Sequence, residues 1–242
     1  MSERARADKV LVERGLFESR AKAQAAIEAG LVEANGALVR KPSEEIPPNA
    51  VISAAPAHPY VSRGGLKLAA AFDHFDFDPR SKTCLDVGAS TGGFTHLLLE
   101  RGASTVYAID VGTSQLHTSL RGDPRVVSLE QTDIRNLSAS QLREPPSLVV
   151  IDVSFISLKH VLPSVTALAA KPGQLVALIK PQFEAGRDSV KKGVVRDHAI
   201  HKAVCDDISA AVAALGWRVA GVIPSPITGG DGNAEFLLGA IR

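Results

Sequence analysis

The sequence predicts an α/β protein in which an open, doubly wound, mostly parallel sheet follows a small α+β module. From about residue 60, apolar runs typical of buried parallel strands alternate with stretches of helical periodicity. The residues before them indicate two short helices and a hairpin. With 242 residues, the chain is long enough for one large and one small domain. We therefore expect a small domain over 1–58, a linker over 59–64 and the sheet domain over 65–242.

The elements of the small domain are predicted from helix caps and one turn. A first helix over 5–15 stops at a glycine, and Ser19 is a suitable N-cap for a second helix over 20–30, which also ends in glycine. Asn35-Gly36 lies inside an alternating stretch and strongly favours a two-residue hairpin turn. A further strand is expected over 49–54. So few elements bury little surface alone, so we interpret them as an accessory module.

The larger domain begins with an amphipathic helix over 65–75, in which apolar residues recur at helical spacing. Strands are expected over 83–89, 105–112, 126–133, 147–155, 174–180, 217–225 and 234–241, and further helices over 92–102, 157–169 and 199–216. Because no helix separates the last two strands, they should pair antiparallel. A seven-stranded Rossmann-like sheet with such a late hairpin resembles the class I methyltransferase fold.

Composition excludes several classes of protein. No stretch approaches the roughly 20 apolar residues that cross a bilayer, and the N-terminus lacks the apolar centre of a signal peptide. The two cysteines suit reduced thiols in the cytoplasm better than a disulfide framework, and no Cys/His cluster has the spacing of a metal site. A net charge of +1 does not by itself indicate a nucleic-acid-binding protein.

Basic residues nevertheless cluster within the small domain, where they could bind phosphates. On charge alone, a solvated helix face explains them better. However, the segment "RADKVLVERGLFESRAKAQAAIEAGLVEANGALVRKPSEEIPPNAVI" resembles the RNA-binding domain named after the fourth protein of the small ribosomal subunit. A polar stretch over 184–198 is either a lid over RNA or a solvated loop. The candidate RNA-binding residues are Arg4, Arg6, Lys9, Arg20, Lys22, Arg63, Arg187, Lys191 and Lys192.

A glycine-rich turn, "LDVGASTGGFT", follows the first strand of the large domain and favours close approach of the backbone to a ligand. It lacks the Gly-x-Gly-x-x-Gly spacing of dinucleotide sites. Acids end three successive strands: Asp86 for an ammonium group, directly or through water, Asp110 for ribose hydroxyls and Asp133 for an adenine amino group. This pattern favours S-adenosylmethionine over NAD. The candidate cofactor residues are Asp86, Gly88, Ala89, Ser90, Thr91, Gly92, Gly93, Phe94, Asp110, Val111, Asp133, Ile134 and Asp152.

Two further charges end buried strands, Asp152 and Lys180, and should be neighbours because consecutive strands usually pair. The alternative is that each charge merely marks where a strand meets water. With Lys67 and Glu235 they form a set that could activate a hydroxyl nucleophile, since burial or a second ammonium favours a neutral amine. The sequences "DVSF" and "KPQFE" differ from the Pro-Pro-aromatic pattern of many base methyltransferases, which favours oxygen as the acceptor.

The order Lys67, Asp152, Lys180, Glu235 is similar to the catalytic tetrad of the FtsJ-like ribose 2′-O-methyltransferases. With the small domain and the "SRGGLKL" segment, almost the whole chain resembles the TlyA family, some of whose members have been called haemolysins. The resemblance implies methylation of cytidine 2′-hydroxyls in ribosomal RNA, with ribosomal subunits as partners. The alternatives are a NAD-dependent oxidoreductase on the same fold and a non-enzymatic RNA-binding or haemolysin-type protein. Lysis is disfavoured, because no strongly basic amphipathic helix is present.

Overall fold

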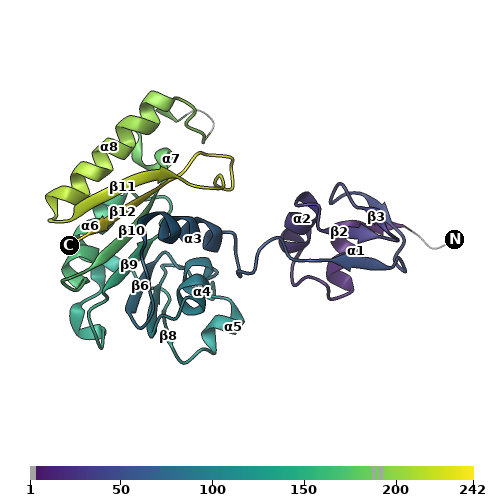
Figure 1. Ribbon diagram of the computed structural model, residues 1–242, viewed down its shortest axis with the longest axis horizontal. Coiled ribbons are helices and arrows are strands. Elements are labelled where there is room, and N and C mark those ends of the chain that lie inside the picture. Colours follow the sequence, from purple (N-terminus) through teal and green to yellow (C-terminus); the bar gives the residue numbers. More distant parts are fainter. Residues whose placement is uncertain (1–3, 187–188, 191–192) are drawn as a thin grey trace. The chain divides into compact units, whose positions relative to one another are not determined.

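The computed structural model describes residues 4–186, 189–190 and 193–242. The chain divides into two compact units, Met1–Pro59 and Tyr60–Arg242. Each unit has its own hydrophobic core, and the larger contains a sheet with a core on either face. Figure 1 shows both units and labels most of their helices and several of their strands.

The N-terminal unit packs two helices against short strands. Helix α1 (Ala7–Glu13) is followed by α2 (Arg20–Glu28), which Ser19 caps by accepting a hydrogen bond from the Lys22 backbone N–H. Strand β2 (Val32–Ala34) pairs with β3 (Ala37–Leu38) across the Asn35-Gly36 turn and with β5 (Ile52–Ala54). The sequence did not predict β1 (Ala5–Arg6) and β4 (Glu45–Ile46), because two-residue strands carry no alternation.

The larger unit is built on a seven-stranded sheet of order β11-β12-β10-β9-β6-β7-β8. The five strands β6 to β10 run parallel to one another, and β12 is antiparallel to both of its neighbours, β10 and β11. The predicted Rossmann-like sheet with a late antiparallel hairpin is therefore confirmed. The strands are β6 (Thr83–Val87), β7 (Thr105–Ile109), β8 (Val126–Leu129), β9 (Leu148–Ile151), β10 (Gln174–Ile179), β11 (Arg218–Pro224) and β12 (Phe236–Ile241).

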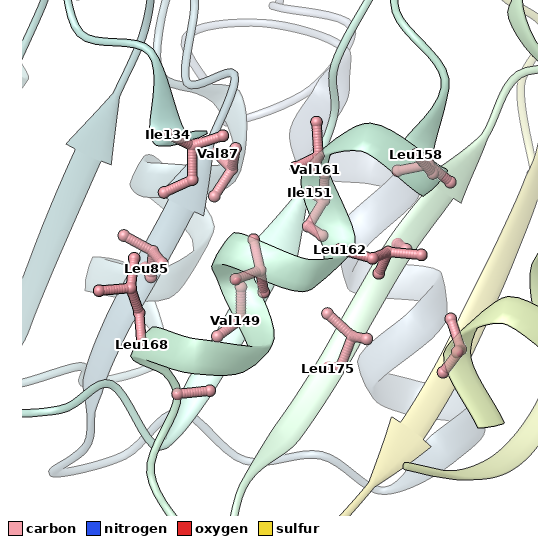
Figure 2. Close-up of a cluster of buried hydrophobic side chains, with 14 of the residues drawn as sticks. Leu85, Val87, Ile134, Val149, Ile151, Leu158, Val161, Leu162, Leu168 and Leu175 are labelled. Atoms are coloured by element: carbon pink, nitrogen blue, oxygen red, sulfur yellow. The ribbon is translucent and has the colours of Figure 1, made fainter. Parts of the chain in front are cut away.

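Helices cover both faces of this sheet. Helices α6 (Leu158–Leu168) and α8 (His198–Ala214) pack on one face, and α3 (Gly64–Phe75) and α4 (Gly93–Glu100) on the other. Figure 2 shows Val161 and Leu162 of α6 lying over Val149 and Ile151 of β9. Short helical segments complete the connections: α5 (Thr118–Arg121), α7 (Pro181–Glu184) and the 3-10 turns η1 (Ile134–Asn136) and η2 (Ala139–Gln141).

The register of the sheet brings the predicted site residues to one edge. Ala177 of β10 pairs with Ile151 of β9, so Asp152 and Lys180 follow adjacent parallel strands at the same end. Ile179 pairs with Phe236 of the antiparallel β12, and Glu235 therefore immediately precedes that strand where β10 ends. One edge of the sheet thus collects charges that lie up to 83 positions apart in the sequence.

Candidate active site

The turn after β6 comes unusually close to the end of β9, and glycine is what permits it. Gly88 has φ +82°, and a Cβ at this position would lie 2.4 Å from the backbone oxygen of Asp152. The backbone N–H groups of Gly88 and Ala89 donate hydrogen bonds to the Ile109 carbonyl of β7. The glycine turn is therefore fixed against two neighbouring strands, with its backbone at the edge of the sheet.

Two adjoining cavities open at this edge. The strand-end cavity, of about 480 Å³, is lined by residues that follow β6, β7, β8 and β9. The helix cavity, of about 270 Å³, is lined by the glycine turn and the start of α3. Gly88, Ser90 and Asp152 line both cavities, which therefore form one continuous site. Of the other predicted cofactor residues, Asp110, Val111, Asp133 and Ile134 line the strand-end cavity, and Ala89, Thr91, Gly93 and Phe94 line the helix cavity.

Asp110 holds the glycine turn in place. Its Oδ2 accepts a hydrogen bond of 2.7 Å from the Ser90 backbone N–H, and its Oδ1 accepts one of 2.7 Å from Gly112. Each carboxylate oxygen has a second acceptor position, so the side chain can still receive a diol from the cavity.

Asp133, which we expected to bind an adenine amino group, forms an ion pair with a neighbouring arginine. Both of its oxygens accept hydrogen bonds from the Arg135 guanidinium, at 3.0 Å for Oδ1 and 2.5 Å for Oδ2. This contact holds the pKa of Asp133 below its usual range. An adenine amino group would therefore share the carboxylate with Arg135, whose side chain also lines the strand-end cavity.

Asp86 is fully buried and lines neither cavity. Thr95 Oγ1 donates a hydrogen bond of 2.7 Å to Oδ2, whereas Oδ1 has no hydrogen-bond partner among the described residues. Burial, together with the negative charge of Asp152, raises the pKa of Asp86 to about 7. Of the two expected modes of ammonium binding, contact through water fits this position and direct contact does not. Gly92 also lies outside both cavities, facing Leu116 and Leu120.

Lys180 lies at the end of β10 and is held by two groups from the segment after β9. Its Nζ is 2.6 Å from Asp152 Oδ1, in an ion pair whose angle is poor for a hydrogen bond. The same nitrogen donates a well-directed hydrogen bond of 2.8 Å to Ser154 Oγ. With only 11 % of its side chain exposed, Lys180 has little freedom to leave these partners.

Lys67 and Glu235 form a second buried ion pair beside the first. Lys67 comes from the first turns of α3, and its Nζ donates a hydrogen bond of 2.5 Å to Glu235 Oε2. Gly229 leaves room for this carboxylate, because a Cβ there would lie 2.6 Å from Glu235 Oε1. Lys67 and Asp152 line the same helix cavity. The four predicted residues therefore form two acid–amine pairs, and one member of each pair lines the helix cavity, whereas Lys180 and Glu235 line neither cavity.

Two family models match the chain in the same division as its two units. Residues 60–242 match the FtsJ-like methyltransferase model, and residues 5–52 match the S4 domain. The 16S/23S rRNA (cytidine-2′-O)-methyltransferase TlyA of Mycobacterium tuberculosis is 42% identical over 98% of this chain and 90% of its own length. The chain is an FtsJ-like methyltransferase of the TlyA family. Its cofactor is S-adenosylmethionine, which the family and the fold imply.

Other relatives cover the methyltransferase equally well. A protein named Hemolysin A from Brachyspira hyodysenteriae is 41% identical over 96% of this chain and 98% of its own. The solved structure described as "Putative hemolysin from Streptococcus thermophilus" is 42% identical, with a TM-score of 0.78 over 100% of this chain and 90% of that one. Within the described part of this methyltransferase, no helix has the length and apolar character needed to cross a membrane.

The site of the methyltransferase fits S-adenosylmethionine. The glycine turn brings backbone to the cavity wall, Asp110 would offer carboxylate oxygens to a ribose, and the exposed Val111 and the buried Ile134 would supply apolar contact for an adenine ring. Beneath the cavities, the oxygen of Asp86 that has no hydrogen-bond partner among the described residues would suit a cationic group.

Sequence reasoning missed three residues at the site: Arg135, Ser154 and Phe155. Phe155 is the most conspicuous, since it is 91 % exposed, has φ +65° and lines the strand-end cavity. Its ring lies 5.0 Å from that of Phe183, centroid to centroid. An aromatic residue within "DVSF" was visible in the sequence, but its exposure was not.

The candidate RNA-binding residues fall in several places. Arg4, Lys9 and Arg20 are exposed in the N-terminal unit, and Lys22 there forms an ion pair with Glu18. Arg6 is half-buried in the same unit, and Arg63 lies exposed on the wall of the helix cavity. Arg187, Lys191 and Lys192 lie outside the described residues.

Proposed function

We propose that this methyltransferase methylates ribose 2′-hydroxyls of ribosomal RNA, with cytidine as the target nucleoside, and that it acts on ribosomal subunits in the cytoplasm. The relatives at 42% identity are named for this reaction. The observation that carries the proposal is that each lysine is held by an acid: Lys180 by Asp152, which lines both cavities, and Lys67, which lines the helix cavity, by Glu235. We propose the cytoplasm as the compartment because ribosomal subunits, the proposed substrates, are found there.

A sugar hydroxyl is a weak nucleophile at neutral pH and must be positioned and activated. When bound, S-adenosylmethionine supplies a methyl group on a positively charged sulfur. Lys180 has two of its nitrogen's directions committed, to Asp152 and to Ser154, so the remaining direction can meet a 2′-hydroxyl in the cavity. We assign Lys180, in its neutral amine form, the role of accepting the hydroxyl proton as the oxygen attacks the methyl group. Asp152 keeps the nitrogen in place and balances the positive charge that the lysine gains with that proton.

Lys67 and Glu235 serve the same oxygen in this proposal, through Lys67 on the wall of the helix cavity. The Lys67 nitrogen offers a positive charge toward the oxygen on which negative charge develops. Glu235 fixes that nitrogen through the 2.5 Å hydrogen bond, in surroundings that exclude most water. Amines paired with acids suit an acceptor that must lose a proton. An exocyclic base nitrogen would instead need acceptors for its own N–H groups.

The N-terminal unit supplies affinity for RNA in this proposal. It matches the S4 domain and exposes basic side chains on α1 and α2. Phosphate contacts of this kind position an RNA without reading its sequence. The choice of nucleotide then lies with the larger unit, where Phe155 presents an exposed aromatic face at the cavity for a base to stack on.

The test is Lys180→Ala in the full chain. Nucleoside mass spectrometry of ribosomal RNA from cells lacking the enzyme should show 2′-O-methylcytidine after incubation with the wild-type chain and none with the variant. Calorimetric titration should give the same affinity for S-adenosylmethionine in both. Lys202→Ala is the matched control, because Lys202 is exposed on α8, pairs with Asp206 and lines neither cavity. A Lys180→Ala variant that methylates at the wild-type rate would exclude this mechanism, and methylation of a base would exclude the proposed acceptor.

A further inference from the structure

The N-terminal unit contains a buried carboxylate for which methyl transfer has no use. Asp8, in the first turn of α1, is 0 % exposed. A carboxylate in such a place is costly unless charged partners and hydrogen bonds compensate it. A buried charge in a unit of fewer than 60 residues therefore calls for an explanation in terms of its partners.

Those partners are two arginines and a glutamine. Arg6 donates two parallel hydrogen bonds of 3.0 Å, from Nε to Asp8 Oδ1 and from Nη2 to Oδ2. Arg20, from α2, donates to Oδ2 from Nη2 at 2.7 Å and from Nε at 3.3 Å. Gln24 Nε2 adds a bond of 2.8 Å to the same oxygen. The Arg6 guanidinium, followed by Arg20 and Gln24, holds the pKa of Asp8 well below its usual range.

The two guanidinium groups face outward from this shared anchor. The side chains of Arg6 and Arg20 are 41 % and 51 % exposed, whereas that of Asp8 is 0 % exposed. A guanidinium has five N–H donors, and each arginine directs only its Nε and one Nη2 proton at Asp8. Three donors of each arginine therefore remain for a ligand. One buried negative charge between two cations leaves the cluster with a net positive charge.

We propose that Asp8 is a positioning residue that holds Arg6 and Arg20 as a fixed clamp for one backbone phosphate of the ribosomal RNA. The inference rests on the proposed function, since it assumes that the N-terminal unit binds that RNA. Arginine forks match phosphate geometry, and a side chain already fixed in place loses less conformational entropy when it binds. The phosphate approaches the exposed edges of both guanidiniums while the carboxylate stays beneath them.

Loss of the Asp8 carboxylate should change the affinity for RNA in the direction opposite to that expected from net charge. Removing an acid from an RNA-binding surface should strengthen binding if only net charge matters, because phosphate repulsion falls. Asp8→Asn should instead weaken binding, on the order of tenfold, the effect of one lost charge-assisted hydrogen bond. The asparagine keeps the size of the side chain but turns an N–H toward the guanidiniums, which releases both arginines.

The experiment uses the full chain and ribosomal RNA from cells lacking the enzyme, with Kd from filter binding over a range of salt concentrations. We compare Asp8→Asn, the double variant Arg6→Gln/Arg20→Gln, and the triple variant. Asp8→Asn should lower the affinity at every salt concentration and raise KM for the RNA with kcat unchanged. In the triple variant, Asp8→Asn should add nothing to the loss caused by the two arginine changes. Arg14→Gln is the charge-matched control, because Arg14 contacts the Ala50 carbonyl and not Asp8, and its effect should add to that of Asp8→Asn.

Circular dichroism at the assay temperature must show equal helix content, and Asp8→Glu serves as a second variant that keeps the charge. Partial recovery of affinity by the glutamate supports the inference. Equal or tighter RNA binding by Asp8→Asn overturns it and leaves the proposed function intact, and so does full additivity in the triple variant. If the wild-type chain itself does not bind or methylate the RNA, the proposed function fails, and the inference fails with it.

Discussion

The pH dependence of stability offers a sharp test of the site, through Asp86→Asn. Asp86 is fully buried, its Oδ1 has no hydrogen-bond partner among the described residues, and burial raises its pKa from an ordinary 3.8 to about 7 in the folded chain. Because the pKa of Asp86 is higher in the folded chain than in the unfolded chain, the contribution of this carboxyl group to stability is complete below pH 3.8. That contribution is lost as the pH rises toward 7. The difference corresponds to about 4 kcal/mol of unfolding free energy by pH 8.

The asparagine variant has no charge to bury, so this loss disappears. Its amide N–H has no partner in place of Oδ1, which costs about 1–3 kcal/mol at every pH. We therefore expect the variant to be less stable than the wild-type chain near pH 4 and more stable near pH 8. Urea unfolding followed by fluorescence of Trp217, the single tryptophan, reports on the larger unit because this side chain is buried there.

Asp133→Asn is the control for this experiment. Arg135 lowers the pKa of Asp133, so the contribution of Asp133 to stability is already complete above pH 4. The difference in unfolding free energy between Asp133→Asn and the wild-type chain should therefore stay constant from pH 5 to 8. If the free energy difference between Asp86→Asn and the wild-type chain stays within about 1 kcal/mol from pH 4 to 8, the buried carboxyl is not destabilised by its surroundings. That result would refute the reasoning.

Two further predictions concern the segment after β9. Ser154→Ala should reduce kcat about tenfold with unchanged affinity for S-adenosylmethionine, because it removes the hydrogen bond that directs Lys180. Ser154→Thr should restore most of the rate. Equal rates in all three chains would show that the hydroxyl has no part in positioning the amine. Phe155→Ala should raise KM for ribosomal RNA by about tenfold, which is the effect of one lost base-stacking contact. Thermal stability should not change, because the ring is 91 % exposed. A lower Tm with an unchanged KM would assign the ring to packing instead.

The sheet and the location of the site follow from the sequence because they depend on long, regular signals. Apolar runs ended by a charge predicted where Asp152 and Lys180 would lie, and the register of β9 and β10 places both at one edge. The state of individual side chains did not follow. Arg135 occupies the carboxylate of Asp133 from two positions away, a contact that depends on one rotamer. Likewise, no periodicity distinguishes a buried Asp8 from an exposed one, since its burial depends on partners 12 and 16 positions further along.

The carboxyl groups of this chain differ in their charged partners. Asp152 and Glu235 each face a lysine, and Asp8 faces two arginines. Asp86 forms no ion pair among the described residues, and burial raises its pKa. A cation entering the neighbouring helix cavity would attract the charge on Asp86 and lower that pKa. By linkage, such a ligand must bind more tightly as the pH rises through about 7, which is the behaviour we expect of the ammonium group of S-adenosylmethionine until that group itself loses its proton.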